Sequence, residues 1–133
     1  MEEKKMEEKL RKFACLCGRK VWHLLSEEGR NAVTTAEKYA AATKEDIEAA
    51  RSEVYNVIPL WDPPRGLALH VALDTIIDDP EIAALAAIGD APAVIAMAEV
   101  GPAGFVSNDN RWIEAYSRAR RELEEEFVTM ILL

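Results

Sequence analysis

Three polar side chains in the middle of the chain form the pattern closest to a chemical site. His70, Asp74 and Asp78 are spaced four residues apart, so a helix that begins near Pro63 or Pro64 and runs to about Asp78 places them on one face. An imidazole and two carboxylates on one face could bind a divalent cation, or a carboxylate could orient the histidine. The alternative is a solvated acidic stripe in which His70 pairs with Asp74.

Two cysteines form the second pattern. Cys15 and Cys17 are two residues apart, which on a helix turns their side chains about 200° away from each other. They cannot chelate one ion or form an unstrained disulfide without breaking the helix, so we predict buried structural thiols. His23 lies on neither cysteine's face and is expected to be a satisfied core or boundary residue.

Apolar side chains near the C-terminal end are candidates for an interface. The segment 127–133 is nearly all apolar and either packs into the fold or contacts a partner, with Phe127, Met130 and Ile131 as its main residues. Trp61, in a proline-rich loop, and Trp112, near a helix start, are further anchor candidates. The alternative for both tryptophans is packing in the core.

The sequence lacks the common catalytic signatures. It contains no glycine-rich phosphate loop, no G-x-S-x-G, no H-E-x-x-H and no EF-hand loop. The sequence therefore favours a protein without catalytic activity, and no cofactor is predicted.

Length and charge narrow the class of protein. The chain has 133 residues, which suits one domain, and half of them are hydrophobic, which is too many for intrinsic disorder. The net charge of −8 argues against binding to nucleic acid or to an anionic membrane. Residues 60–106 carry seven acidic side chains and one basic, so most of the negative charge lies there.

Targeting signals are not evident either. Residues 1–12 are too charged for a signal peptide. The longest apolar run, Ile82 to Val100, is expected to be broken by Asp90 and Pro92 before it reaches membrane-spanning length. Two cysteines with one residue between them do not provide the disulfide framework of a small secreted domain, so the expected location is the cytoplasm.

Spacing of the apolar residues predicts helices almost throughout. Met6, Leu10, Phe13, Cys17, Val21 and Leu24 recur at steps of three and four, and the charged start over 1–12 is expected to protrude or fray. Ser26, Thr43 and Asp79 have the pattern of helix N-caps. The remaining helices are expected over about 27–42, 44–58, 63–78, 80–89, 91–101 and 109–133. We therefore predict an all-α, single-domain bundle of six to seven helices spanning 1–133, with long terminal helices and short Ala-rich helices between them.

A resemblance covers about a quarter of the chain. Residues 13–25 read F-A-C-L-C-G-R-K-V-W-H-L-L, followed by an acidic turn and by Ala32-Val33, Ala36-Glu37 and Tyr39-Ala40. This resembles a helical segment of uncharacterised bacterial proteins, especially from planctomycetes, which has a third cysteine where this chain has Gly18. The resemblance implies a helical bacterial domain and carries no mechanism. It also implies that Cys15, Cys17, Trp22 and His23 belong together, either as one packing unit or as a site.

Two hypotheses on function follow. The first is a small, acidic helical module of bacterial or phage type that binds another protein or a second copy of itself. The alternative is a divalent-metal-binding protein, or a metal-dependent enzyme, that uses the face of His70, Asp74 and Asp78. A ligand pocket among the Ala-rich helices is a third, weaker possibility.

Overall fold

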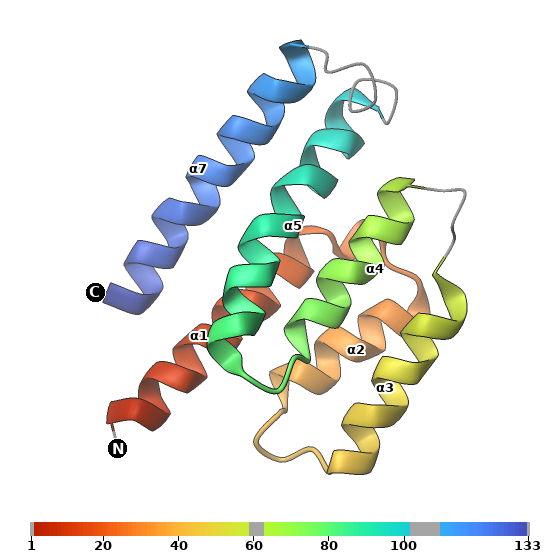
Figure 1. Cartoon of the computed structure of the whole chain (residues 1–133), viewed down its shortest axis with the longest axis vertical. Coiled ribbons are helices and arrows are strands. Elements are labelled where there is room, and N and C mark those ends of the chain that lie inside the picture. Colours follow the sequence, from red (N-terminus) through yellow and green to blue (C-terminus); the bar gives the residue numbers. More distant parts are fainter. Residues whose placement is uncertain (1, 59–62, 102–109, 133) are drawn as a thin grey trace.

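The computed structural model describes residues 2–58, 63–101 and 110–132, and these residues form helices joined by short turns without a strand (Figure 1). The helices are α1 (Glu2–Lys20), the 3₁₀ turn η1 (Trp22–Leu24), α2 (Glu27–Glu37), α3 (Lys44–Val57), α4 (Pro63–Thr75), α5 (Pro80–Val100) and α7 (Asn110–Leu132). The predicted all-α, single-domain bundle is confirmed.

Helix starts follow the predicted capping residues. The Ser26 hydroxyl accepts a hydrogen bond from the Gly29 amide (3.4 Å), and Thr43 and Asp46 form a reciprocal capping box. Asp79 Oδ1 accepts from the amides of Glu81 (2.9 Å) and Ile82 (3.3 Å). Pro80 then occupies the first turn of α5, where its missing N–H is not needed.

Helix ends differ from the predictions in three places. The first helix ends at Lys20 and continues as η1, and α2 ends at Glu37, not near Ala42. The helix predicted to reach Asp78 ends at Thr75. At that end the carbonyl groups of residues 75–78 accept hydrogen bonds from Arg11 of α1 and Arg51 of α3. These carbonyl groups are therefore satisfied without another turn of helix.

The two short Ala-rich helices predicted around residues 80–101 are a single helix. α5 runs through Gly89, Asp90 and Pro92 without a break and ends at Gly101, whose φ of +97° is the left-handed backbone that favours glycine. Proline lacks an N–H, so Pro92 leaves one intrahelical hydrogen bond unmade, but packing on several sides preserves the helix.

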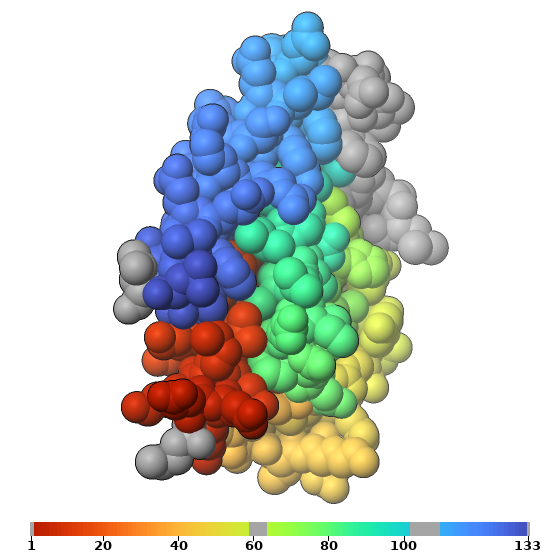
Figure 2. Space-filling model, turned by 60° about the vertical axis from the view of Figure 1, so that its left-hand side comes forward, coloured from red at the N-terminus to blue at the C-terminus, as the bar shows by residue number. Residues whose placement is uncertain are grey.

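α5 is the central helix of the bundle. It packs against α1, α4 and α7, and on the face shown in Figure 2 α1, α5 and α7 lie side by side. Five of its eight buried residues are alanine, and these small side chains let neighbouring helices approach closely. The expected break at Asp90 and Pro92 is wrong, because the helix is continuous through both residues. In length and composition α5 is the one described helix that could span a membrane, a test that a core helix also passes.

The core joins both ends of the chain to this central helix. Phe13 of α1 is fully buried and meets Phe127 of α7 edge to face, with ring centroids 5.1 Å apart. Val33 of α2, Val71 of α4 and Val94 of α5 are also fully buried in the same cluster. α3 covers one side through Ala50 and Val54.

Candidate functional site

The predicted face of His70, Asp74 and Asp78 does not form. His70 is exposed on α4, Asp74 is buried one turn later, and Asp78 lies beyond the end of the helix. In the ranges that the structure describes, no three His, Cys, Asp or Glu side chains lie close enough to hold a metal ion. The spacing argument failed because it extended the helix by one turn too many.

Asp78 instead belongs to a cluster that holds the end of α4. We call Arg11, Tyr39, Arg51 and Asp78 the α4 clasp. Arg11 Nη1 donates to the carbonyl oxygens of Thr75 (2.9 Å) and Ile77, and Arg11 Nη2 donates to that of Asp78 (2.9 Å). The last carbonyls of a helix lack intrahelical partners, so a cation there satisfies them and also complements the helix dipole.

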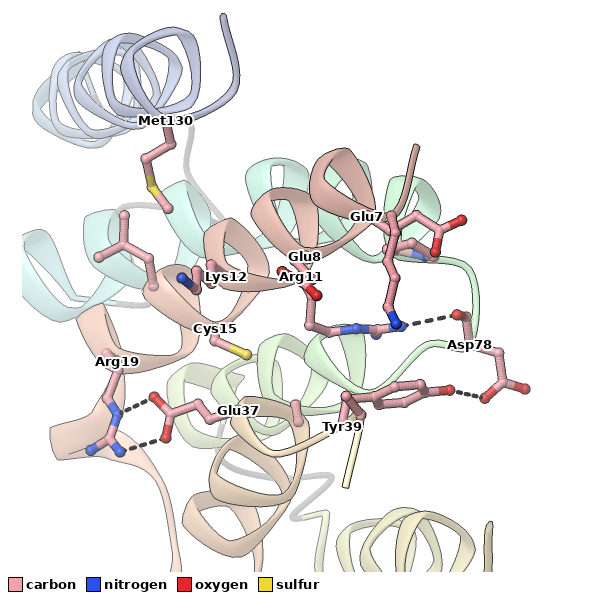
Figure 3. Close-up of a pocket in the computed structure, with 15 residues that line it drawn as sticks. Glu7, Glu8, Arg11, Lys12, Cys15, Arg19, Glu37, Tyr39, Asp78 and Met130 are labelled. Carbon is pink, nitrogen blue, oxygen red and sulfur yellow. Dashed lines mark hydrogen bonds and ion pairs between the residues drawn. The ribbon is translucent and has the colours of Figure 1, made fainter. Parts of the chain in front are cut away.

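The aromatic ring of Tyr39 completes the clasp. The Arg11 guanidinium carbon lies 3.9 Å from the ring centroid, and the Tyr39 hydroxyl donates to Asp78 Oδ1 at 2.7 Å (Figure 3). Arg51 of α3 donates to the Ile76 carbonyl (2.9 Å) and lies 3.6 Å from Asp78 Oδ1. The Tyr39 hydrogen bond, with Arg51, lowers the pKa of Asp78, and burial lowers the pKa of Arg11.

Asp74 has a different environment. Its side chain is 8% exposed, and burial, followed by a hydrogen bond with the Asp90 side chain of α5, raises its pKa far above its usual range. A carboxyl group in this position is neutral at pH 7. Asp74 therefore acts as part of the α4–α5 contact and not as a ligand on an exposed face.

The two thiols are buried but lie in different surroundings. Cys17 is fully buried in the core, whereas Cys15 is 4% exposed and lines a surface groove. Burial raises the pKa of both thiols to about 12, so neither is a thiolate at neutral pH. Neither is in a disulfide.

Trp22 and His23 lie on the surface side of the same segment. The half-buried ring of Trp22 has the Arg19 guanidinium carbon 4.0 Å from its centroid and that of Arg30 at 5.3 Å. His23 is exposed and lines a smaller groove between η1, α5 and α7. Trp22 nevertheless packs against the core cluster that contains Cys15 and Cys17, so three of the four residues of the predicted packing unit share one cluster and His23 lies outside it.

A groove along α1 is hollowed into the surface of the described part of the chain (Figure 3). We call it the α1 groove, and its volume is about 770 Å³. Its residues come from α1, from the end of α2 and the turn after it, from the α4–α5 turn and from α7: Lys4, Glu7, Glu8, Arg11, Lys12, Cys15, Leu16, Arg19, Ala36, Glu37, Tyr39, Ala40, Asp78, Pro80 and Met130.

Apolar atoms and charges are combined in this groove. Cys15, Leu16, Ala36 and Met130 supply apolar surface, while the charged side chains include both signs. Arg19 donates two hydrogen bonds to Glu37 at 2.9 and 2.7 Å, which fixes one edge. A groove with apolar surface and ordered charges can accept an amphipathic segment of another chain.

The candidate interface residues near the C-terminal end divide between core and groove. Ile131 is buried, Phe127 packs on Phe13, and Met130 lines the α1 groove. Trp112 is half-buried and stacks on Tyr116, with ring centroids 5.2 Å apart. Trp61 lies outside the described residues.

Sequence reasoning missed Arg11 and Tyr39. Arg11 lies in the charged run 1–12, which we expect to protrude or fray, and Tyr39 lies within the helix expected over about 27–42. The signal in the sequence was an arginine between Leu10 and Phe13, at the edge of the apolar face of the first helix. The spacing of apolar residues cannot show which carbonyl groups that arginine contacts.

Comparison with known proteins gives no relative for this chain: no family model, curated protein or solved structure matches it.

Proposed function

We propose that this chain is a small, non-enzymatic helical module that binds another protein through the α1 groove. The observation that carries the proposal is the groove itself, a hollow of about 770 Å³ that combines apolar surface with charges of both signs. Hydrophobic contact supplies most of the affinity at such a surface, and the charges select the partner and its orientation.

The groove is held in place before any partner arrives. The α4 clasp fixes Arg11 through three carbonyl groups and the Tyr39 ring, and the Arg19–Glu37 pair fixes the opposite end. Side chains that are already ordered lose little conformational entropy on binding, which favours affinity.

An exposed alanine allows a selective test of this groove. Ala40 lines the groove and is exposed, so Ala40→Arg fills the hollow without disturbing the core. The matched control is Ser52→Arg, which adds the same charge at an exposed position of α3 outside the groove.

Photo-crosslinking identifies the partner. A benzophenone side chain at Lys12, an exposed groove residue, is activated in cells of the source organism, and crosslinked proteins are identified by mass spectrometry. We expect a defined protein adduct that Ala40→Arg abolishes and Ser52→Arg leaves unchanged. The proposal would be contradicted if Ala40→Arg gave the same adducts as the chain without it, or if no protein adduct formed.

Sedimentation velocity distinguishes a second copy from a different protein. A concentration-dependent increase in mass that Ala40→Arg removes identifies the partner as another copy of this chain. A monomer at all concentrations, together with a crosslinked adduct, identifies a different protein.

A further inference from the structure

The contact between α4 and α5 contains a buried carboxyl group that faces another carboxyl group. Asp74 is 8% exposed, and its Oδ2 atom has no hydrogen-bond partner among the residues described. Its side chain forms a hydrogen bond with that of Asp90 on α5. An ionised carboxylate can only accept hydrogen bonds, so a hydrogen bond between two carboxyl groups requires one of them to carry a proton.

Among the described residues, the charged group that acts on the Asp74 carboxyl is another carboxyl and not a cation. Asp90 is the charged group that acts on Asp74, and the ionisable group of α1 that Asp74 affects is the neutral Cys17 thiol. Arg11 of α1 and Arg51 of α3 hold the end of α4, and Lys20 of α1 pairs with Glu126 of α7. His70, one turn earlier on α4, is exposed.

α5 is weakest at the same point. Gly89 is exposed, and a methyl group added to it would meet no atom within 4 Å, so packing does not hold this residue. Pro92 lacks an N–H, so the carbonyl group of Ile88 loses its usual helical partner. These are the features that predict two helices from the sequence, whereas the structure has one.

We propose that a single proton shared by Asp74 and Asp90 latches α4 to α5 and keeps α5 continuous through Gly89–Pro92. When Asp74 releases this proton to solvent, two negative charges face each other in a poorly solvated contact. The pair then separates, and α5 loosens at its weakest step. This inference is independent of the proposed function, because neither aspartate lines the α1 groove.

The position of the switch follows from burial. Removal from water disfavours the charged form, and the raised pKa of Asp74 places the opening on the alkaline side of neutrality. The latch is thus closed at pH 6 to 7 and opens as pH rises.

Hydrogen exchange tests the latch. Amide protection of residues 88–94 is measured from pH 6 to pH 10 and corrected for intrinsic exchange. If opening exposes Asp74, protection falls by about tenfold per pH unit until the raised pKa is passed. Asp74→Asn keeps a hydrogen-bond donor but cannot titrate, so its protection should stay constant. Glu81→Gln, an exposed carboxyl of the same helix, is the matched control and should behave like the unmodified chain.

A second measurement keeps the proposal testable if Asp74→Asn does not fold. Carbon-13 NMR of the side-chain carboxyls in the unmodified chain should show one proton held by the Asp74–Asp90 pair at pH 7. Full ionisation of both groups by pH 6 would overturn the proposal, as would the same pH dependence of protection in the unmodified chain and in a folded Asp74→Asn.

Discussion

The Arg11 guanidinium of α1 stacks 3.9 Å from the ring centroid of Tyr39, which follows α2, and both residues hold the end of α4. Arg11 reaches three carbonyl groups, and Tyr39 reaches the Asp78 carboxylate of the same turn. The cation–π contact and these hydrogen bonds together join three segments that are far apart in the sequence.

Replacing Arg11 should destabilise the fold. Arg11→Ala leaves the carbonyl groups of Thr75, Ile77 and Asp78 without this donor, and we expect the free energy of unfolding to fall by about 2–3 kcal/mol. Arg11→Lys should recover only part of the loss, because an ammonium group lacks the planar fork of donors. Chemical denaturation measures the change. The control is Lys9→Ala, at an exposed position of the same helix, whose free energy of unfolding should stay within about 0.5 kcal/mol of the unmodified chain. If Arg11→Ala changes the free energy of unfolding no more than Lys9→Ala does, Arg11 does not hold the end of α4.

The same substitution should have opposite effects at two glycines. Gly89→Ala adds a methyl group in open space on α5 and should stabilise the chain by about 0.5–1 kcal/mol. Gly18→Ala places a Cβ 2.9 Å from Val33 Cγ2 and 3.2 Å from Thr75 Cγ2, and should destabilise it by about 1–3 kcal/mol. Thermal unfolding of both variants gives the comparison. A stabilised Gly18→Ala would show that α1, α2 and α4 can separate there without loss.

Both thiols should be unreactive in the folded chain. Burial raises the pKa of Cys15 and Cys17 to about 12, so the thiolate fraction at pH 8 is very small. Ellman's reagent should modify neither cysteine in buffer and both in denaturant. Rapid modification of Cys15 alone in buffer would contradict this prediction and would mean that the α1 groove opens enough to expose the Cys15 thiol to solvent.

Stability should fall as the pH rises from the ordinary pKa of an aspartate to the raised pKa of Asp74. The folded chain holds a proton on Asp74 that the unfolded chain, with its ordinary pKa of 3.8, has already released at neutral pH. Folding therefore takes up a proton between these two pKa values, and the free energy of unfolding decreases by at most about 1.4 kcal/mol per pH unit. The contribution is fully present below the unfolded pKa and is lost as pH passes the raised one.

Urea unfolding from pH 5 to pH 10 measures this dependence. Asp74→Asn should flatten the curve and be more stable than the unmodified chain at pH 8. Glu99→Gln, at an exposed position of the same helix as Asp90, should leave the slope unchanged. Parallel curves for Asp74→Asn and the unmodified chain would exclude a proton on Asp74.

Local rules predicted where helices begin but not where three of them end. Ser26, Thr43 and Asp79 cap as expected, because an N-cap depends on residues within one turn. The end of α4 depends on Arg11, 64 residues away from Thr75, and no local pattern contains that contact. The continuity of α5 depends in the same way on neighbouring helices that the sequence pattern does not show.

The candidate site illustrates the same limit. The spacing of His70, Asp74 and Asp78 was real, but one extra turn of helix was assumed, and the three side chains have different surroundings. The α1 groove combines residues of α1, the α2 end and α7, so it cannot be predicted from the pattern of any single segment.

The central position of α5 has a consequence for synthesis on the ribosome. α1 and α4 bury apolar side chains against α5, which follows both of them in the chain. While residues 1–79 emerge, these surfaces have no native partner, and only the contacts among α1 to α4 can form. The nascent chain therefore cannot complete its core until α5 has left the exit tunnel. Until then the apolar side chains of α1 and α4 are accessible to chaperones.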